Sequence, residues 1–216
     1  MHDSAALSGE GMAIKYGISS GIVVDVGGQD VNGSLKKYFV NAGMKYICVD
    51  MEEHSSVDVF VKPGDPLPFE DGSVDMVIST SCFEHDPCFW MTFREMARIV
   101  KLGGYVYVNA PSRGPYHGYP GDNWRFYGDA GQALAHWAGR EFVGNSYPME
   151  VTETFHIFPD NLQLSGFNEW YDYVCVWKRI TTPVDKIVDS EKKKFVGILE
   201  DYLNNTKGMK TFKMEK

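Results

Sequence analysis

Short runs of apolar, mostly β-branched or aromatic residues alternate along the chain with stretches in which apolar residues recur every three or four positions. The near-continuous apolar runs are typical of strands buried on both faces of a parallel sheet. The stretches between them have the period of helices that pack along one face. Strands are predicted over residues 21–26, 45–50, 57–61, 74–80, 105–110, 141–147 and 171–178, and helices over residues 34–42, 88–101 and 130–140.

This alternation predicts an α/β fold with a doubly wound, mostly parallel sheet of seven strands and helices on both faces. Such a sheet binds its ligand at the carboxyl ends of its strands. We expect one domain over residues 1–216, with an N-terminal extension over 1–20 and a helical tail over 181–216. The segment 111–129 is dense in Gly, Pro and aromatic residues, and ordered loops of this length are usually functional.

Composition narrows the class of partner. The formal net charge of −8 disfavours a nucleic-acid surface, which is usually basic. The first residues lack the pattern of a secretory signal, and no apolar run approaches the roughly 20 residues of a membrane helix. The four cysteines show no paired spacing, and the acidic residues show no spacing typical of a divalent-metal site. We therefore expect a cytoplasmic protein with no nucleic-acid partner, no membrane partner and no metal; the oligomeric state stays open.

The first predicted strand runs into a glycine-rich turn, VVDVGGQDVNGS, at residues 23–34. Neither frame of a dinucleotide fingerprint supplies its second glycine, and Asp30 would put a carboxylate beside the phosphates, so a nicotinamide-dependent oxidoreductase is disfavoured. A turn without any ligand is one alternative. The other is a site for a cofactor with positive charge and no phosphate, such as S-adenosylmethionine, whose sulfonium and ammonium groups suit nearby acids.

Four motifs appear in a fixed order along this region: Asp25-Val-Gly27, Asp50 at the end of the second strand, GDPLPFEDGSVDMVISTSCFEH at 64–85 and KLGGYVYVNAP at 101–111. With them the chain resembles the class I S-adenosylmethionine-dependent methyltransferases, in particular the small type 11-like domains, over residues 21–112. Gln29 stands where that family has a further glycine. The resemblance implies a Rossmann-like fold, S-adenosylmethionine as the cofactor and methyl transfer as the activity.

The resemblance also assigns roles. Asp50 accepts the ribose hydroxyls with its two oxygens, and Gly27 and Gly28 let the backbone approach the methionine end. Asp25 either binds the ammonium group or caps the loop. The segment after the third strand meets the adenine. The predicted cofactor-binding residues are Asp25, Gly27, Gly28, Gln29, Asp50, Met51, Gly64, Asp65 and Ser81.

Two histidines are candidate bases for the acceptor: His85 after the fourth strand and His117 in the loop after the fifth, with His156 a weaker third. The loop residues have two readings. They either form an acceptor pocket or form an ordered lid in which the aromatics pack on the sheet edge and Asp122 pairs with Arg125. The predicted acceptor-binding residues are Tyr116, Tyr119, Asp122, Trp124 and Arg125.

The sequence thus predicts a methyltransferase acting on a small polar acceptor, with a hydroxyl of a sugar or related metabolite as the leading choice. The alternatives are a nucleic-acid or protein methyltransferase and a catalytically silent cofactor-binding subunit. The pI of about 5.2 and the run STSCFEH, which differs from the Asp-Pro-Pro-Tyr motif of amino-directed DNA enzymes, count against a nucleic-acid substrate.

Overall fold

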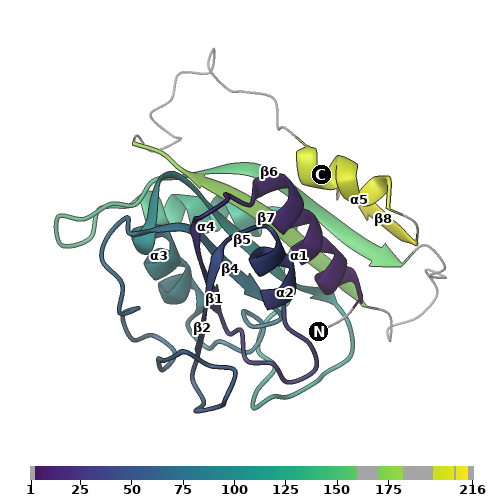
Figure 1. Cartoon of the computed structure of the whole chain (residues 1–216), viewed down its shortest axis with the longest axis horizontal. Helices are drawn as coiled ribbons and strands as arrows, with labels where there is room; N and C mark the ends of the chain where they lie inside the picture. The colour runs from purple at the N-terminus through teal and green to yellow at the C-terminus, as the bar shows by residue number, and fades with distance from the viewer. Residues whose placement is uncertain (1–2, 160–169, 182–196, 207, 214–216) are drawn as a thin grey trace.

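The computed structural model of the chain describes residues 3–159, 170–181, 197–206 and 208–213. Its helices are α1 (Asp3–Tyr16), α2 (Lys36–Asn41), α3 (Phe89–Ile99), α4 (Ala130–Gly139) and α5 (Ile198–Asn204). Its strands are β1 (Ile22–Val26), β2 (Lys45–Asp50), β3 (Val59–Phe60), β4 (Val74–Thr80), β5 (Val100–Arg113), β6 (Met149–Pro159), β7 (Tyr171–Arg179) and β8 (Met209–Phe212). Figure 1 shows their arrangement around a single sheet.

The described strands form one mixed sheet in the order β3-β2-β1-β4-β5-β7-β6-β8. β1 to β5 are parallel neighbours, whereas β7 runs antiparallel to both β5 and β6. The order reverses between β1 and β4, which is the switch point where ligands bind in open α/β sheets. The predicted doubly wound α/β fold is therefore confirmed, with eight strands in place of seven because β8 pairs with β6.

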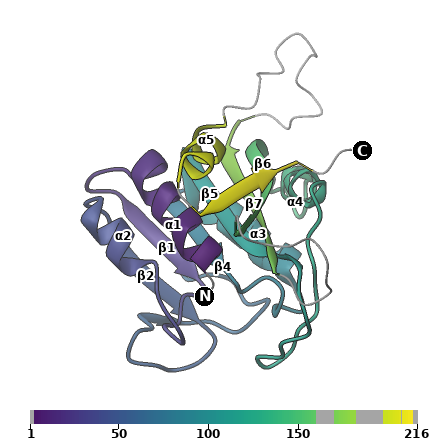
Figure 2. The ribbon, with the colours of Figure 1, turned by 90° about the vertical axis from the view of Figure 1, so that its right-hand side faces the viewer.

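Alternate strand residues enter two cores, one on each face of the sheet. Val23 of β1 packs in the layer covered by α1, α2 and α5, and its neighbour Val24 packs in the layer covered by α3 and α4. Figure 2 shows α1 and α2 on one side of the sheet and α3 and α4 on the other. Burial of apolar surface on both faces explains why the central strands read as unbroken apolar runs. No helix in the described parts of the chain is long and apolar enough to cross a membrane.

α3 is amphipathic, and its polar face fixes the segment that follows β3. Phe93, Met96 and Ala97 enter the core, while Arg98 reaches back to that segment. The Arg98 guanidinium donates to the carbonyls of Leu67 and Phe69, each at 2.8 Å. Glu95 accepts from the Leu67 N–H at 2.9 Å. The chain that leads from β3 to β4 is therefore tied to a rigid helix.

One predicted strand is wrong, and the predicted helical tail is helical only in part. Residues 141–147, expected to be a strand, form a turn closed by an isolated bridge between Phe142 and Asn145, with Val143 fully exposed at a φ of 51°. The strand lies further on, as β6. A bulge between Val151 and Glu153 shifts the register, so that Met149 and Val151 pack in one core and Phe155 and Ile157 in the other. The tail, expected to be helical over 181–216, contains α5 and also β8; residues 182–196 lie outside the described part.

Candidate cofactor and acceptor site

The turn after β1 leaves no room for side chains. The N–H groups of Gly27 and Gly28 both donate to the carbonyl of Val49 in β2, at 2.8 and 3.2 Å. Gly27 has a φ of 75°, and a Cβ there would lie 2.3 Å from the Cys82 sulfur. A Cβ on Gly28 would lie 2.8 Å from Cγ of Asp25. The two glycines are needed because the turn touches β2, the segment after β4 and a buried acid at once.

Asp25 lies beneath this turn and is 3% exposed. Its Oδ2 accepts a hydrogen bond from the Tyr46 hydroxyl, while its Oδ1 has no hydrogen-bond partner among the described residues. Burial raises the pKa of Asp25 to about 7; the Tyr46 hydrogen bond opposes this shift and the charge of Asp50 adds to it. A cation beside Oδ1 would reverse the shift.

The carboxylate of Asp50 closes the other side of the turn. Its Oδ2 accepts from the N–H of Gln29 at 3.0 Å and its Oδ1 from the N–H of Met51 at 2.7 Å. The backbone N–H groups of two predicted cofactor residues, Gln29 and Met51, therefore bind the half-buried carboxylate of a third, Asp50. Each carboxylate oxygen can accept more than one hydrogen bond, so Asp50 can still receive two ribose hydroxyls.

Two further predicted cofactor residues have unusual backbones. Ser81 follows β4 with a φ of 50°, and its N–H donates to the carbonyl of Asn109 at 2.9 Å. Gly64 has a φ of 85°, and a Cβ there would lie 3.1 Å from the Cys88 sulfur. A serine held at a positive φ is strained, and strained residues of this kind gather at binding sites, whereas Gly64 adopts its φ without strain. Asp65 is exposed beside Gly64.

Buried polar atoms without hydrogen-bond partners gather at this edge of the sheet. Among the described residues, five side chains with such atoms lie at the ends of β1, β4 and β5 or just beyond: Asp25, Thr80, Glu84, Asn109 and Ser112. A buried polar atom without a partner costs about 1–3 kcal/mol, so a row of them marks a place where another molecule provides the hydrogen bonds. The row leads from the cofactor turn to the two predicted bases.

Those two histidines converge on one acid. Glu84 is 1% exposed, and its Oε1 lies 3.6 Å from Nε2 of His85 and 3.8 Å from Nε2 of His117. Burial raises the pKa of Glu84 to about 8. Burial also lowers the pKa of His117, although the neighbouring Asp122 charge opposes this. The structure thus brings both predicted bases together.

The loop 111–129 is held by its own ion pair. Arg125 contacts both oxygens of Asp122, with Nη2 to Oδ2 at 2.7 Å, and donates to the Pro115 carbonyl at 3.0 Å. Arg125 holds the pKa of Asp122 well below its usual range. Asp122 in turn accepts from Nδ1 of His117 at 3.1 Å. These contacts fit the lid interpretation of Asp122 and Arg125, and they orient His117.

The aromatic residues of the loop divide into two groups. Trp124 donates from Nε1 to the Asp86 carbonyl at 2.9 Å and packs on Phe89, so it anchors the loop. Tyr116 and Tyr119 are 77% and 54% exposed and face solvent. His156, the third candidate base, is buried in β6 among the rings of Tyr173 and Phe212 and lies apart from Glu84 and the other two histidines.

Several residues of this site were missed from the sequence. Tyr46 holds Asp25, Glu84 lies between the histidines, and Trp170 packs on the ring of His117 at 4.7 Å between centroids. Asn109 alone carried a signal, because it interrupts the apolar run of β5. Tyr46 and Trp170 could not be found, since their partners are far away in sequence, and Glu84 stands next to His85 but its burial is not visible in the sequence.

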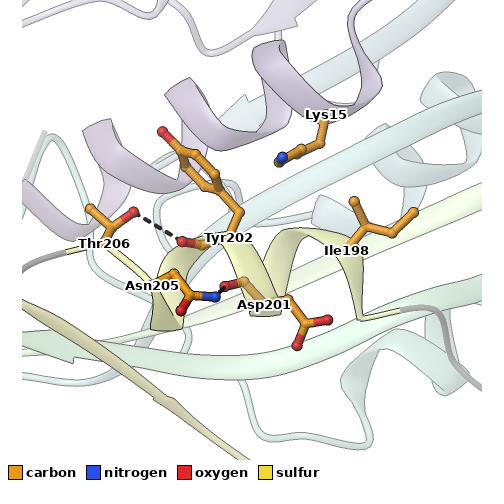
Figure 3. A pocket seen from close by; sticks show the side chains of 6 residues that line it. All are labelled: Lys15, Ile198, Asp201, Tyr202, Asn205 and Thr206. Atoms are coloured by element: carbon orange, nitrogen blue, oxygen red, sulfur yellow. Dashed lines mark hydrogen bonds between the residues drawn. The ribbon is translucent and has the colours of Figure 1, made fainter.

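A separate surface pocket of about 450 Å³ lies between α1 and α5 and contains none of the predicted site residues. Figure 3 shows Tyr202 of α5 reaching toward α1 and Lys15, with Asp201 and Asn205 beside it. The Lys15 ammonium lies 5.3 Å from the centre of the Tyr202 ring. This pocket is built from ordinary helix contacts and has no unpartnered buried polar atom.

The strand order, the glycine turn and the acid at the end of β2 are typical of class I S-adenosylmethionine-dependent methyltransferases. In agreement, residues 24–108 match the family of the methyltransferase domain. That segment is a methyltransferase domain, and its cofactor is S-adenosylmethionine.

Known proteins of this kind are similar to the chain. It is 33% identical over 109 residues to an uncharacterized methyltransferase of Mycolicibacterium gilvum (strain PYR-GCK), which covers 45% of this chain and 42% of that one. It is 29% identical over 150 residues to an uncharacterized methyltransferase of Mycobacterium leprae (strain Br4923), covering 61% and 55%. The chain thus spans about half the length of the curated relatives it matches.

A solved structure shares the fold at low identity. The 1,6-didemethyltoxoflavin-N1-methyltransferase of Burkholderia thailandensis, with 1,6-didemethyltoxoflavin and S-adenosylhomocysteine bound, superposes with a TM-score of 0.55 at 14% identity, covering 83% of this chain and 80% of that chain. At this identity the likeness concerns the fold alone.

Proposed function

We propose that the protein transfers the methyl group of S-adenosylmethionine to a hydroxyl of a small polar acceptor, a sugar or a related metabolite. The observation that carries this proposal is the row of unpartnered buried polar atoms that leads from Asp25 to Glu84. It joins the cofactor turn to a pair of histidines, so both reactants can lie along one edge of the sheet.

In this proposal the cofactor is held at three points. Asp25 binds its ammonium group, Asp50 binds its ribose hydroxyls, and the segment at Gly64 and Asp65 meets the adenine. The backbone of Gly27 and Gly28 passes beside the methionine end, because neither residue has a Cβ. Gln29, Met51 and Ser81 complete the contacts.

The acceptor lies under the loop 111–129, between the sulfonium and the two histidines. Its oxygen attacks the methyl carbon as the carbon–sulfur bond breaks, and its proton passes to Nε2 of His117. Asp122 supports this role because it accepts from Nδ1 of His117, which leaves the lone pair on Nε2. His85 is the second candidate for the same proton. Tyr116 and Tyr119 are exposed on this loop and contact the acceptor when it binds, Trp124 anchors the loop beside it, and Arg125 with Asp122 holds the loop in place.

Other features support a small acceptor in a reducing compartment. All four cysteines are free thiols, as expected in the cytoplasm. The net charge of −8 argues against a nucleic acid as the acceptor or a partner. The toxoflavin-precursor enzyme shows that this fold accepts small molecules in at least one distant protein.

The test is turnover with S-adenosylmethionine that carries a deuterated methyl group. The protein is incubated with sets of sugars, polyols and hydroxy acids, and labelled products are identified by mass spectrometry. A labelled O-methyl product, reduced about 100-fold or more in His117→Gln and unchanged in the exposed control His136→Gln, supports the proposal. Binding of S-adenosylhomocysteine without any product from hydroxyl acceptors would instead identify the silent cofactor-binding alternative.

A further inference from the structure

Glu84, His85 and His117, which form the acceptor half of the site, are also arranged as a metal site would be. One possible ligand atom from each of the three lies within 4.8 Å of the others. The two measured separations from Glu84 Oε1 to the histidine Nε2 atoms are 3.6 and 3.8 Å. Two ligands about 2.1 Å from a metal ion at a tetrahedral angle are roughly 3.4 Å apart, so small side-chain rotations would bring the three atoms to coordination distance.

Both histidine rings are fixed from behind. Nδ1 of His85 bonds to the Gly121 carbonyl, which can only accept, so Nδ1 carries the proton and Nε2 keeps its lone pair. Nδ1 of His117 bonds to the Asp122 carboxylate, which gives the same tautomer. A carbonyl or carboxylate behind a histidine is the usual outer support of a metal-binding imidazole.

Glu84 supplies an independent reason for a ligand. The side chain is 1% exposed, and its Oε2 has no hydrogen-bond partner in the described residues. No arginine or lysine lies within ion-pair distance of it there. An acid buried in this way is stabilised either by its own proton or by a cation placed at the site.

We propose that Glu84, His85 and His117 bind a divalent first-row transition-metal ion of the zinc class. Two imidazole ligands favour such an ion over Mg²⁺ or Ca²⁺, which prefer oxygen. Three protein ligands leave open coordination positions, as in catalytic rather than structural metal sites. The sequence indicated the two histidines but not that they meet, because His117 is 32 residues from His85 and only the fold of the loop joins them.

The role of the ion rests on the proposed function, whereas its binding does not. An open position beside the methyl donor can take the acceptor hydroxyl. A bound ion would lower the pKa of that hydroxyl, so that its proton would leave to solvent while the oxygen attacks the methyl carbon and the carbon–sulfur bond breaks. Nε2 of His117 has one lone pair, so metal binding replaces the histidine base rather than assisting it.

Metal binding can be measured without any acceptor. The chelator-treated full chain is titrated with Zn²⁺, Co²⁺ and Mg²⁺ by calorimetry, and Co²⁺ binding is followed by its visible absorption. We expect one Zn²⁺ per chain, Co²⁺ bands typical of a nitrogen and oxygen ligand set, and much weaker Mg²⁺ binding. Glu84→Gln and His117→Gln should each weaken Zn²⁺ binding by about 100-fold, and Asp122→Asn by roughly 10-fold.

His136→Gln, which removes an exposed histidine on α4, should bind Zn²⁺ as the wild type does. His117 is itself partly exposed, so His117→Gln remains informative if Glu84→Gln does not fold. Equal Zn²⁺ binding by the wild type and His117→Gln, or no binding by the wild type, would overturn the proposal. S-adenosylhomocysteine binding, measured on the same samples, separates this result from a failure of the methyltransferase assignment.

Discussion

In the proposed site Asp25 binds the ammonium group of the cofactor, which makes cofactor binding depend on pH. The pKa of Asp25 is raised from 3.8 to about 7 by burial, so the ligand-free protein carries a neutral acid below neutral pH. The ammonium group of S-adenosylhomocysteine requires the charged form. Below pH 7, binding must therefore release one proton, and the affinity falls by up to tenfold for each pH unit.

The size of this change in affinity follows from the fraction of Asp25 that is ionised at each pH. Between pH 7.5 and pH 5.5 this fraction falls by about 25-fold for a pKa near 7, and the dissociation constant should rise by the same factor. Calorimetry with S-adenosylhomocysteine at four pH values measures it. Tyr46→Phe removes the hydrogen bond that favours the charged form, so the midpoint should move to higher pH.

Asp25→Asn is the control, because it keeps a carbonyl for the Tyr46 hydroxyl and cannot ionise. It should bind weakly at every pH with a flat profile. Stability gives a second readout. A raised carboxyl pKa stabilises the folded state below about pH 4, and this contribution is lost as the pH rises through 7. The Tm of Asp25→Asn should therefore gain on that of the wild type between pH 5 and pH 8. A pH-dependent affinity that persists in Asp25→Asn would refute this reasoning.

Three further changes probe the turn, the scaffold and the loop. Gly28→Ala places a Cβ 2.8 Å from Asp25, so the affinity for S-adenosylhomocysteine should fall at least tenfold. In the control Gly197→Ala the nearest neighbour of the added Cβ lies at 3.5 Å, and this variant should bind as the wild type does. Equal binding by the two variants would contradict the turn geometry. Arg98→Ala removes the donors to the carbonyls of Leu67 and Phe69, so the free energy of unfolding measured in urea should fall by about 2–4 kcal/mol. Arg98→Lys should not restore this loss. A loss below about 0.5 kcal/mol would show that other contacts hold the segment. Tyr116→Ala changes a side chain that is 77% exposed, so Tm should be unchanged while KM for the acceptor rises several-fold; an unchanged KM would remove Tyr116 from the acceptor site.

The cofactor half of the site could be predicted because its residues lie in one turn and at the end of the neighbouring strand. Asp25, Gly27 and Gly28 are consecutive in one turn, and Asp50 ends the neighbouring parallel strand, so the strand pattern alone places them together. The same pattern predicted the order of the central elements. The pattern did not predict β6, because a bulge in that strand changes which residues face each core. The alternation of apolar and polar residues in the sequence cannot show such a change.

The acceptor half was only partly predictable. The sequence indicated His85, His117 and a functional loop, but not that the loop would bring both rings to Glu84. That arrangement depends on Arg125 reaching Asp122 and Pro115, and on Trp124 reaching the Asp86 carbonyl. Such contacts between side chains and a loop backbone follow no sequence period. The burial of Glu84, which gives it an unpartnered oxygen, is likewise a property of the folded chain alone.

Cofactor binding is the central claim, and calorimetry with S-adenosylhomocysteine tests it most directly. The comparison is between wild type, Asp50→Ala and the neighbouring exposed control Glu52→Ala. Two hydrogen bonds from ribose hydroxyls to a carboxylate are worth about 3 kcal/mol or more, so Asp50→Ala should lose at least about 100-fold in affinity. Glu52→Ala should bind as the wild type does, and NAD should not bind to any of the three. Binding of NAD in place of S-adenosylhomocysteine, or equal binding by wild type and Asp50→Ala, would contradict the account.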